Sequence, residues 1–339
     1  MENDEEEAVR GIVLAVAHEP HVQSLIVNGP GRAFARRFVA GETLDEGIDA
    51  ARRLGKAGAR VSLDYLGESV SSLAAASAAV AVYASTIERL RYLDVPVSLS
   101  IKPSQFGVKL SRERCLGLLN DVVSNAGQIP IGVRLDMEDS SHTDDTLWLA
   151  HQLRERRRPV GIVLQASLYR TPADLENALA AGLSVRLCKG AYAEPASVAF
   201  PRKADVDAAY ARLLERLLTY AGSLPAPAPG HLPPAAIATH DENLIRQAVD
   251  LIHRLNLGKD RYEFQMLYGV RRDLQEKLIA QGYPVRVYTP WGPSWYPYLS
   301  RRLAERPANL VFFVSSLFSE KVARQVPSQP KTGVGSARR

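Results

Sequence analysis

Two adjacent arginines follow an aromatic-rich stretch in the last part of the sequence. Arg301 and Arg302 come after residues 288–298, which read Tyr-Thr-Pro-Trp-Gly-Pro-Ser-Trp-Tyr-Pro-Tyr. A guanidinium group binds a carboxylate through paired hydrogen bonds, and aromatic side chains around it exclude water and strengthen the contact. Glu305 follows Arg301 at the spacing of an ion pair along a helix. The stretch indicates a carboxylate-binding clamp, while an exposed basic helix would carry the same residue types.

Two lysines each follow a short apolar segment directly. Lys102 comes after residues 97–101, and Lys189 comes after residues 185–188. A lysine that loses its hydration in a pocket can form a Schiff base, as in class I aldolases. A lysine beside the carboxylate of Asp136 would instead stay protonated. The residues alone leave both alternatives open.

Other polar residues stand at the ends of similar apolar segments. The set comprises Asp64, Asp136, Glu138, Gln165, Arg186, His240, Gln265 and Tyr288. The Lys-Gly-Ala turn at 189–191 combines small residues with a cation, which suits phosphate oxygens, although an ordinary turn would look alike. His240 lacks the further histidines of a metal hydrolase, so we expect no metal site. The Gly-Pro-Gly stretch at 29–31 follows no strand pattern, which argues against a Rossmann-type nucleotide site.

The apolar segments alternate with helical patterns. Eight short runs have the composition or flanking turn residues of buried strands, at 60–65, 95–101, 131–137, 160–165, 184–188, 236–239, 261–266 and 284–288. Helical patterns lie between them, at 71–92, 112–125, 144–156, 173–181, 206–221, 242–255 and 271–281. This order favours an α/β fold of the (β/α)8, TIM-like barrel type, although a doubly wound open sheet also alternates. In a barrel, the polar residues at the strand ends would gather around one mouth.

The composition predicts one barrel domain with additions at both ends. Hydrophobic residues make up 46% of the chain, which is enough for a large core. We expect residues 1–58 to be a helical segment that packs on the barrel, 59–324 to be the barrel, and 325–339 to be a disordered tail. The acidic start lacks the pattern of a secretory signal, and no apolar run is long enough for a bilayer, so we expect a cytoplasmic protein.

The charge of the chain argues against a nucleic-acid partner. The net charge of +5 is spread over many helical segments, with no basic stripe that contains aromatic residues. The densest basic run, at 156–158, is interpreted as a solvated helix end. A non-enzymatic barrel that serves as a binding protein or scaffold is a further alternative.

Seven ordered motifs resemble the proline dehydrogenase family, in particular its single-function bacterial members. They lie at 100–104, 134–139, 163–170, 185–192, 238–241, 263–269 and 301–305, and the similarity runs from about residue 37 to 314. The resemblance implies a distorted barrel whose last helix lies over the mouth, an FAD cofactor and the oxidation of L-proline to Δ1-pyrroline-5-carboxylate. This reaction is the first step of proline catabolism to glutamate.

The resemblance assigns substrate contacts to residues from five segments: Lys102, Asp136, Leu187, Tyr288, Arg301, Arg302 and Glu305. The two arginines would bind the carboxylate, with the acid at 305 in support, and Tyr288 would pack on the five-membered ring. Lys102 and Asp136 would lie near the amine and the flavin, so both count as catalytic, with Tyr288 and the arginine pair. Hydroxyproline-oxidising relatives carry a smaller residue at the position of Tyr288, so this chain is expected to prefer unsubstituted proline.

The resemblance also assigns cofactor contacts, at Asp136, Gln165, Arg186, Cys188, Lys189, Gly190, Ala191, Tyr192, Lys203, Thr239, His240, Gln265 and Tyr288. Arg186 and Gln165 would contact the isoalloxazine, and residues 189–192 would surround the ribityl and pyrophosphate groups. The chain departs from the family pattern at Ala193, where many relatives have tryptophan, and at Pro201, where many have threonine.

The resemblance implies an electron acceptor as well. A membrane quinone would take the electrons from the flavin, which implies a peripheral contact with the cytoplasmic face of the membrane. The basic tail is a candidate for this contact. A homo-oligomer stays open at this point.

Overall fold

A computed structural model describes residues 32, 35–67, 69–156, 158–225, 227–228 and 231–304. The chain divides into two compact units, one of residues 36–298 and one of residues 1–35 together with 299–339. Three predicted features lie outside the described residues: the first 31 residues of the helical segment 1–58, the tail at 325–339 and Glu305.

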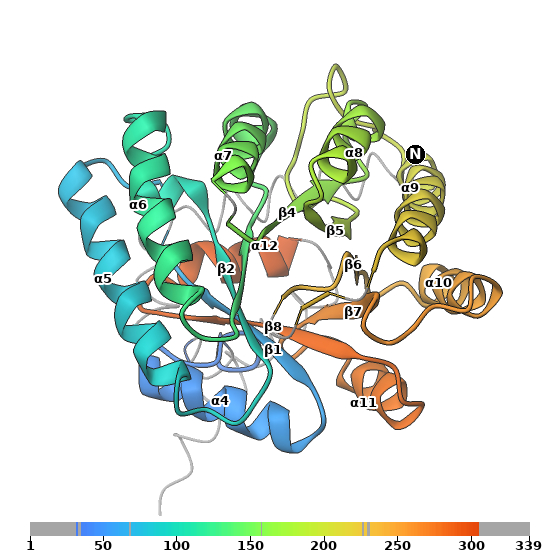
Figure 1. Cartoon of the computed structure of the whole chain (residues 1–339), viewed down its shortest axis with the longest axis horizontal. Helices are drawn as coiled ribbons and strands as arrows, with labels where there is room; N and C mark the ends of the chain where they lie inside the picture. Colours follow the sequence, from blue (N-terminus) through green and yellow to red (C-terminus); the bar gives the residue numbers. More distant parts are fainter. Residues whose placement is uncertain are drawn as a thin grey trace, which may run out of the picture. The chain divides into compact units, whose positions relative to one another are not determined.

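Eight parallel strands close into a barrel in the unit 36–298 (Figure 1). The strands are β1 Arg60–Tyr65, β2 Val97–Ile101, β3 Gly132–Leu135, β4 Val160–Gln165, β5 Ser184–Cys188, β6 Ala235–Ala238, β7 Tyr262–Leu267 and β8 Val285–Trp291. Each strand pairs with the next, and β1 also pairs with β8, with Asp64 opposite Pro290. The predicted (β/α)8 architecture is confirmed. The open-sheet alternative is excluded, because an open sheet would leave two unpaired edges.

Helices surround the barrel in Figure 1; the first precedes β1, and the others follow the strands in turn. They are α4 Leu44–Lys56, α5 Leu73–Leu90, α6 Arg112–Ala126, α7 Thr143–Glu155, α8 Thr171–Ala180, α9 Lys203–Ser223, α10 Glu242–Arg254 and α11 Arg272–Ala280. Two short 3-10 turns, η1 Pro103–Phe106 and η2 Ser140–His142, follow β2 and β3, and α12 Tyr296–Ala304 follows β8. Within these described elements, no helix is both long and apolar enough to traverse a lipid bilayer.

Side-chain caps stand at the start of several helices. The hydroxyl of Ser111 accepts a hydrogen bond from the backbone of Arg114 at the start of α6. The carboxylate of Asp241 accepts one from the backbone of Asn243 at the start of α10. Such caps satisfy backbone N–H groups that have no partner inside the helix. Because α6 and α10 are the next α-helices after β2 and β6, the caps also fix where the loops at the barrel mouth end.

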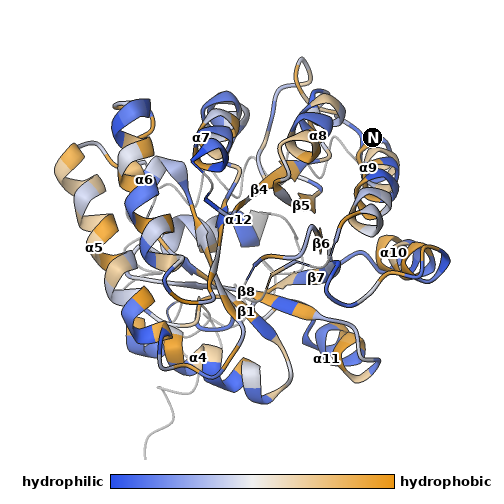
Figure 2. Cartoon of the chain, viewed as in Figure 1, coloured by the Kyte–Doolittle hydropathy of each residue, from blue (hydrophilic) through white to orange (hydrophobic). Residues whose placement is uncertain are grey.

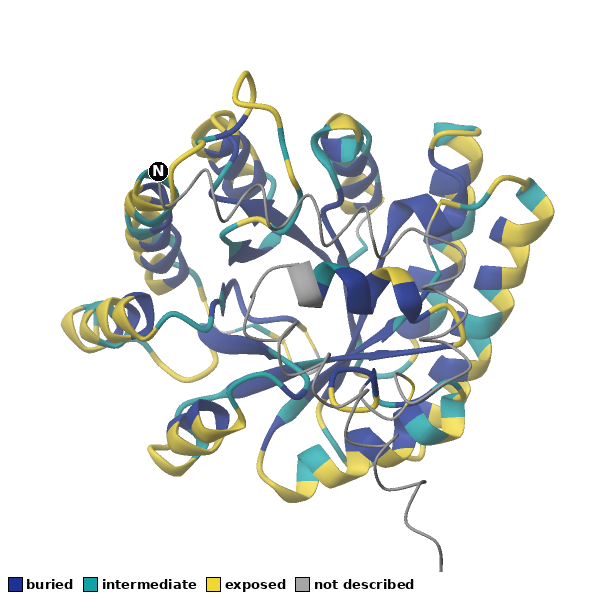
Figure 3. Ribbon diagram, turned by 180° about the vertical axis from the view of Figure 1, so that it is seen from behind, coloured by how far each residue is buried: buried dark blue, intermediate teal, exposed yellow. Residues whose placement is uncertain are grey.

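The apolar core lies between the strands and the helices. The helices turn their apolar faces inward and their polar faces to solvent (Figures 2 and 3). In several strands, apolar residues alternate with polar ones and belong to one buried cluster with the helices, for example Val61 and Leu63 in β1 and Leu99 and Ile101 in β2. Side chains in a strand alternate between its two faces, so the residues between these positions point into the barrel.

The interior of the barrel is polar and charged. Its buried side chains include Ser62, Ser98, Ser100, Arg134, Arg186, Glu263, Gln265 and Arg286. Barrels of this class are usually filled by branched apolar residues, and a buried polar group is costly unless it has hydrogen-bond partners. The interior therefore depends on a hydrogen-bond network, and that network leads to the carboxyl ends of the strands.

Candidate active site at the carboxyl ends of the strands

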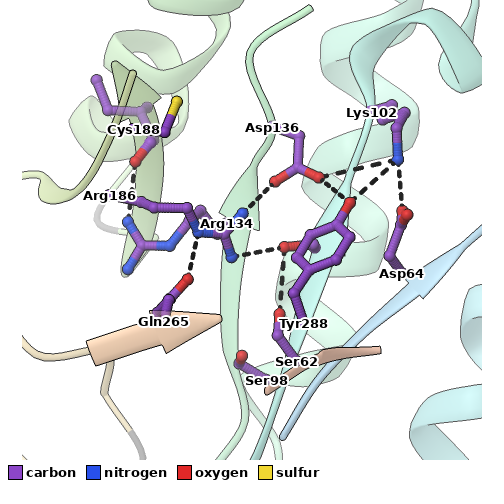
Figure 4. Close-up of polar contacts among 12 residues, drawn as sticks. Ser62, Asp64, Ser98, Lys102, Arg134, Asp136, Arg186, Cys188, Gln265 and Tyr288 are labelled. Atoms are coloured by element: carbon purple, nitrogen blue, oxygen red, sulfur yellow. Dashed lines mark hydrogen bonds and ion pairs between the residues drawn. The ribbon is translucent and has the colours of Figure 1, made fainter. Parts of the chain in front are cut away.

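Arg186 forms the centre of a buried cluster at the carboxyl ends of the strands (Figure 4). Its Nη1 donates to Oδ1 of Asp136 at 2.7 Å, and its Nη2 donates to Oγ of Ser100 at 2.9 Å. Its Nε donates to Oε1 of Gln265. These partners come from β2, β7 and the residue after β3, so the contacts cross the interior of the barrel. A guanidinium group held on three sides presents a fixed positive charge.

Tyr288 and Lys102 extend the cluster toward β1. The hydroxyl of Tyr288 donates to Oδ2 of Asp136 at 2.7 Å, and Nζ of Lys102 donates to that hydroxyl at 3.3 Å. The same ammonium lies 2.7 Å from Oδ1 of Asp64 and 3.9 Å from Oδ2 of Asp136. The ring of Tyr288 lies 5.2 Å from the guanidinium carbon of Arg186. Two carboxylates and two cations thus alternate around one tyrosine.

Burial changes the acidity of two groups in the cluster. It raises the pKa of Asp64 to about 6; the ammonium of Lys102 opposes this rise, and the carboxylate of Asp136 adds to it. Burial also raises the pKa of Tyr288 well above its ordinary value, and the nearby carboxylate of Asp136 adds to that effect. Tyr288 is therefore a neutral hydrogen-bond donor at any working pH. Asp64 can gain or lose a proton near neutrality.

The two lysines among the predicted cofactor contacts, Lys189 and Lys203, lie in a second charged group. Nζ of Lys189 lies 2.5 Å from Asp207 and 2.7 Å from Asp241. Nζ of Lys203, at the start of α9, lies 2.5 Å from Asp207 and 3.8 Å from Asp241. The structure brings the two lysines together, and two carboxylates compensate them. A bound diphosphate would compete with these carboxylates for the same ammonium groups.

Gly190 occupies a position where a side chain would not fit. Its φ is +130°, and an added Cβ would lie 2.3 Å from Oγ of Ser167. Glycine adopts this backbone region without steric cost. The chain after β5 therefore lies directly against the loop after β4. In that neighbourhood, Nε2 of Gln165 donates to the carbonyl of Glu138 at 3.0 Å, so the loops after β3, β4 and β5 are connected.

Four other predicted cofactor residues lie in the loops after β5 and β6. Ala191 and Tyr192 are half-buried. Oγ1 of Thr239 accepts a hydrogen bond from the backbone of Asp241 at 3.1 Å, and Nε2 of His240 accepts one from the backbone of Leu267 at 3.0 Å. Both contacts fix the loop after β6.

Cys188, at the end of β5, is held by the neighbouring strand. Its thiol donates to the carbonyl of Leu164 at 3.5 Å, and burial raises the pKa of this thiol to about 12. The group therefore stays protonated and unreactive.

The structure does not bring Leu187 into the cluster. Leu187 follows Arg186 in β5, and strand alternation turns it to the opposite face, where it belongs to the apolar core. Arg301 and Arg302 lie in the last turn of α12, in the second unit of the chain. The substrate contacts of these three residues stay predictions. The two departures from the family pattern, Ala193 and Pro201, are both exposed.

Two residues of the cluster carry no predicted role from the sequence. Asp64 is noted there only as a polar residue at a strand end, and Ser100 is not singled out by itself. The inward position of Ser100 could have been predicted from the alternation Val-Ser-Leu-Ser-Ile in β2. This alternation places two serines on one face of a buried strand. That alternation predicts a polar barrel interior at this strand.

Comparisons with known proteins identify a family that the chain resembles over most of its length. The family model described as "Proline dehydrogenase" matches residues 48–315. Proline dehydrogenase of Deinococcus radiodurans is 39% identical over 313 residues, which cover 91% of this chain and 97% of the relative. Proline dehydrogenase 1 of Bacillus subtilis strain 168 is 35% identical over 289 residues, which cover 85% and 92%.

A solved structure supports the fold. Proline utilization A (PutA) from Bdellovibrio bacteriovorus, inactivated by N-propargylglycine, superposes with a TM-score of 0.74 and 22% identity. The match covers 89% of this chain and 37% of that protein. The family match over residues 48–315 and the similarity to relatives along most of their length lead to one conclusion: the chain belongs to the proline dehydrogenase family.

Proposed function

We propose that this protein is a flavin-dependent dehydrogenase that oxidises L-proline to Δ1-pyrroline-5-carboxylate. The observation that carries the proposal is the cluster of Lys102, Asp136, Arg186 and Tyr288 at the carboxyl ends of the strands, in a chain of this family. Active sites of (β/α)8 barrels lie at this end. The cluster offers fixed charges and an aromatic ring, which suit a small cyclic amino acid.

The residues after β5 fit a flavin nucleotide, and we assign FAD to this region. Two features suit a diphosphate. The backbone at Gly190 carries no side chain, and the ammonium groups of Lys189 and Lys203 lie near the same carboxylate, that of Asp207. Arg186 would lie at the ring system, together with Gln165, Gln265, Thr239 and His240. The flavin would supply the acceptor for the hydride of the substrate. A fixed cation such as Arg186 would stabilise negative charge on the reduced ring.

The substrate would be held from two sides. Arg301 and Arg302 would bind its carboxylate, with Glu305 in support, and Tyr288 would pack against its ring. Asp136 accepts hydrogen bonds from both Arg186 and Tyr288, so it keeps the ring of Tyr288 in one orientation. The substrate amine must be neutral when the hydride leaves. Activity should therefore fall at low pH.

The Schiff-base alternative requires a neutral lysine. Lys102 instead lies 2.7 Å from the carboxylate of Asp64, a contact that favours the charged ammonium. The absorption spectrum of the purified protein separates the two functions. A flavoprotein should be yellow and lose its colour on anaerobic addition of L-proline. A colourless protein that borohydride links covalently to a carbonyl substrate would contradict the proposal.

The electron acceptor is a separate part of the proposal. We assign a quinone and a peripheral contact with the cytoplasmic face of the membrane, because the resemblance implies both. Anionic vesicles that contain a quinone should reoxidise the reduced protein faster than the same vesicles without it. Equal reoxidation rates with both kinds of vesicle would contradict the quinone assignment but would not bear on proline oxidation.

A further inference from the structure

A chain of hydrogen bonds runs inside the barrel from Glu263 to the proposed flavin site. Glu263 and Gln265 are alternate residues of β7, so both point into the barrel. Nε2 of Gln265 donates to Oε1 of Glu263 at 2.6 Å, and Oε1 of Gln265 accepts from Nε of Arg186. All three side chains are buried. The chain thus connects a group outside the proposed site to a group within it.

Glu263 is held as a carboxylate by two arginines. Its Oε1 accepts from Nε of Arg286 at 2.7 Å, and its Oε2 lies 3.2 Å from Nη1 of Arg60. Burial alone would raise the pKa of Glu263, but the two arginines outweigh it, and the pKa is lowered to about 2. An ionised carboxylate can only accept hydrogen bonds. Glu263 is therefore a permanent acceptor.

The carboxylate selects one orientation of the Gln265 side chain. A glutamine amide has a donor end and an acceptor end, and it can rotate to exchange them. Glu263 accepts only, so the amide nitrogen must face it, and the amide oxygen then faces Arg186. Because a guanidinium donates only, the opposite orientation would place two donors together at Arg186 and two acceptors together at Glu263.

We propose that Glu263 is a positioning residue, which orients Gln265 and through it fixes the guanidinium of Arg186. Gln265 provides one of the three contacts that hold Arg186, beside Asp136 and Ser100. The proposal rests on the proposed function, since it gives Arg186 its place beside the flavin ring. Without the hydrogen bond to Gln265, the guanidinium of Arg186 can rotate, because only its contacts with Asp136 and Ser100 remain.

A double-mutant cycle tests the proposal. The variants are Glu263→Gln, Gln265→Leu and the combination of both, and the readout is the midpoint potential of the bound flavin. Each single variant should move the potential to more negative values, because a displaced Arg186 stabilises the reduced ring less. kcat/KM for proline should fall roughly tenfold, the effect expected for one charge-assisted hydrogen bond. In the Gln265→Leu background, the change at 263 should have no further effect. Additive shifts would overturn the proposal.

The variant Glu263→Asp distinguishes the effect of the position of the carboxylate at 263 from the effect of its charge. The shorter side chain keeps the negative charge for the two arginines but withdraws from Nε2 of Gln265. We expect the potential to shift as in Glu263→Gln, with a smaller loss of stability. A wild-type potential in Glu263→Asp would show that charge alone matters and would refute the positioning role. This variant also keeps the proposal testable where Glu263→Gln does not fold.

Phe264→Leu is the matched control. Phe264 lies between the two residues in β7 but faces outward, where its ring packs against Tyr262 and Tyr283. It should lower stability and leave the flavin potential unchanged. An equal shift in Phe264→Leu would mean that general loosening of β7 explains the effect, and the proposal would fail.

Crystal structures of the variants provide a readout that needs no flavin. The guanidinium of Arg186 should leave its wild-type position in Glu263→Asp and Gln265→Leu but not in Phe264→Leu. An unmoved Arg186 would overturn the role of Glu263 even if proline oxidation is confirmed. A wild-type protein that binds no flavin would contradict the proposed function alone, since the position of Arg186 still tests the inference.

Discussion

The carboxyl group of Asp64 has an unusual environment for an acid. It is fully buried next to Lys102, and its pKa is raised from 3.8 to about 6. A folded state that holds a proton more tightly than the unfolded state is most stable at low pH. Stability from this group is therefore present below its unfolded pKa and decreases as the pH rises toward 6. Above that value the protein bears the cost of a buried charge.

Replacement of Asp64 by asparagine should remove this pH dependence. At about 1.4 kcal/mol for each pKa unit, the wild type should lose about 3 kcal/mol of unfolding free energy across this window relative to Asp64→Asn. Urea unfolding of both proteins at a series of pH values between 4 and 7 measures the difference. A constant difference at all pH values would contradict the raised pKa of Asp64.

Tyr288 offers a test of substrate choice. Tyr288→Ser should increase kcat/KM for hydroxyproline relative to proline roughly tenfold, because space opens for a ring substituent. Tyr288→Phe is the control, since it keeps the ring but loses the hydrogen bond to Asp136. Steady-state kinetics with both substrates gives the ratio for each variant. A ratio that changes equally in both variants would argue against a packing role for Tyr288.

At the scale of elements, the turn after β5 depends on the absence of a side chain. Gly190→Ala combines a left-handed φ of +130° with a Cβ only 2.3 Å from Ser167. It should lower the free energy of unfolding by roughly 1–3 kcal/mol. Gly117→Ala in α6 is the matched control, because nothing lies within 4 Å of its added Cβ. It should stabilise the protein by about 0.5–1 kcal/mol. Denaturant unfolding of both variants tests the contrast.

The last described helix, α12, carries the proposed clamp. Neighbouring residues of a helix point about 100° apart, so Arg301 and Arg302 would reach one carboxylate from two directions. Arg301→Ala and Arg302→Ala should each raise the KM for proline about 10- to 100-fold and leave the flavin spectrum unchanged. Arg216→Ala, which removes an exposed pair with Glu176, is the control and should have no effect. Unchanged KM values for proline in both variants would contradict the proposal that Arg301 and Arg302 bind the substrate carboxylate.

At the scale of the whole molecule, periodicity predicted the order of elements well. The strands β1, β4 and β5 have the predicted bounds, and the other five differ only at their ends. The largest difference is in β8, which continues to Trp291, past a Thr-Pro sequence that suggests a turn. Pairing with β1 along its full length stabilises these last residues as a strand. Tertiary pairing of this kind is not visible in a local pattern.

The contacts of the site were harder to predict than its members. Lys102, Asp136, Arg186 and Tyr288 are all recognisable at strand ends, but their partners are not. The ion pair of Arg186 with Asp136 joins β5 to the residue after β3, which are not neighbouring strands. Such contacts depend on the diameter and closure of the barrel. For the same reason, the link between Glu263 and Arg186 through Gln265 cannot be predicted from a local pattern.

The polar interior has a consequence for how this barrel tolerates change. The apolar packing that favours folding lies outside the ring of strands, whereas the lumen contains directed donors and acceptors. The fold and the chemistry therefore depend on different faces of the same strands. Shell residues are free to exchange among apolar types of similar volume, but each lumen residue is tied to the identity of its neighbours. Replacement of a lumen residue that shares hydrogen bonds with others, such as Gln265, therefore calls for a matching change in its partners.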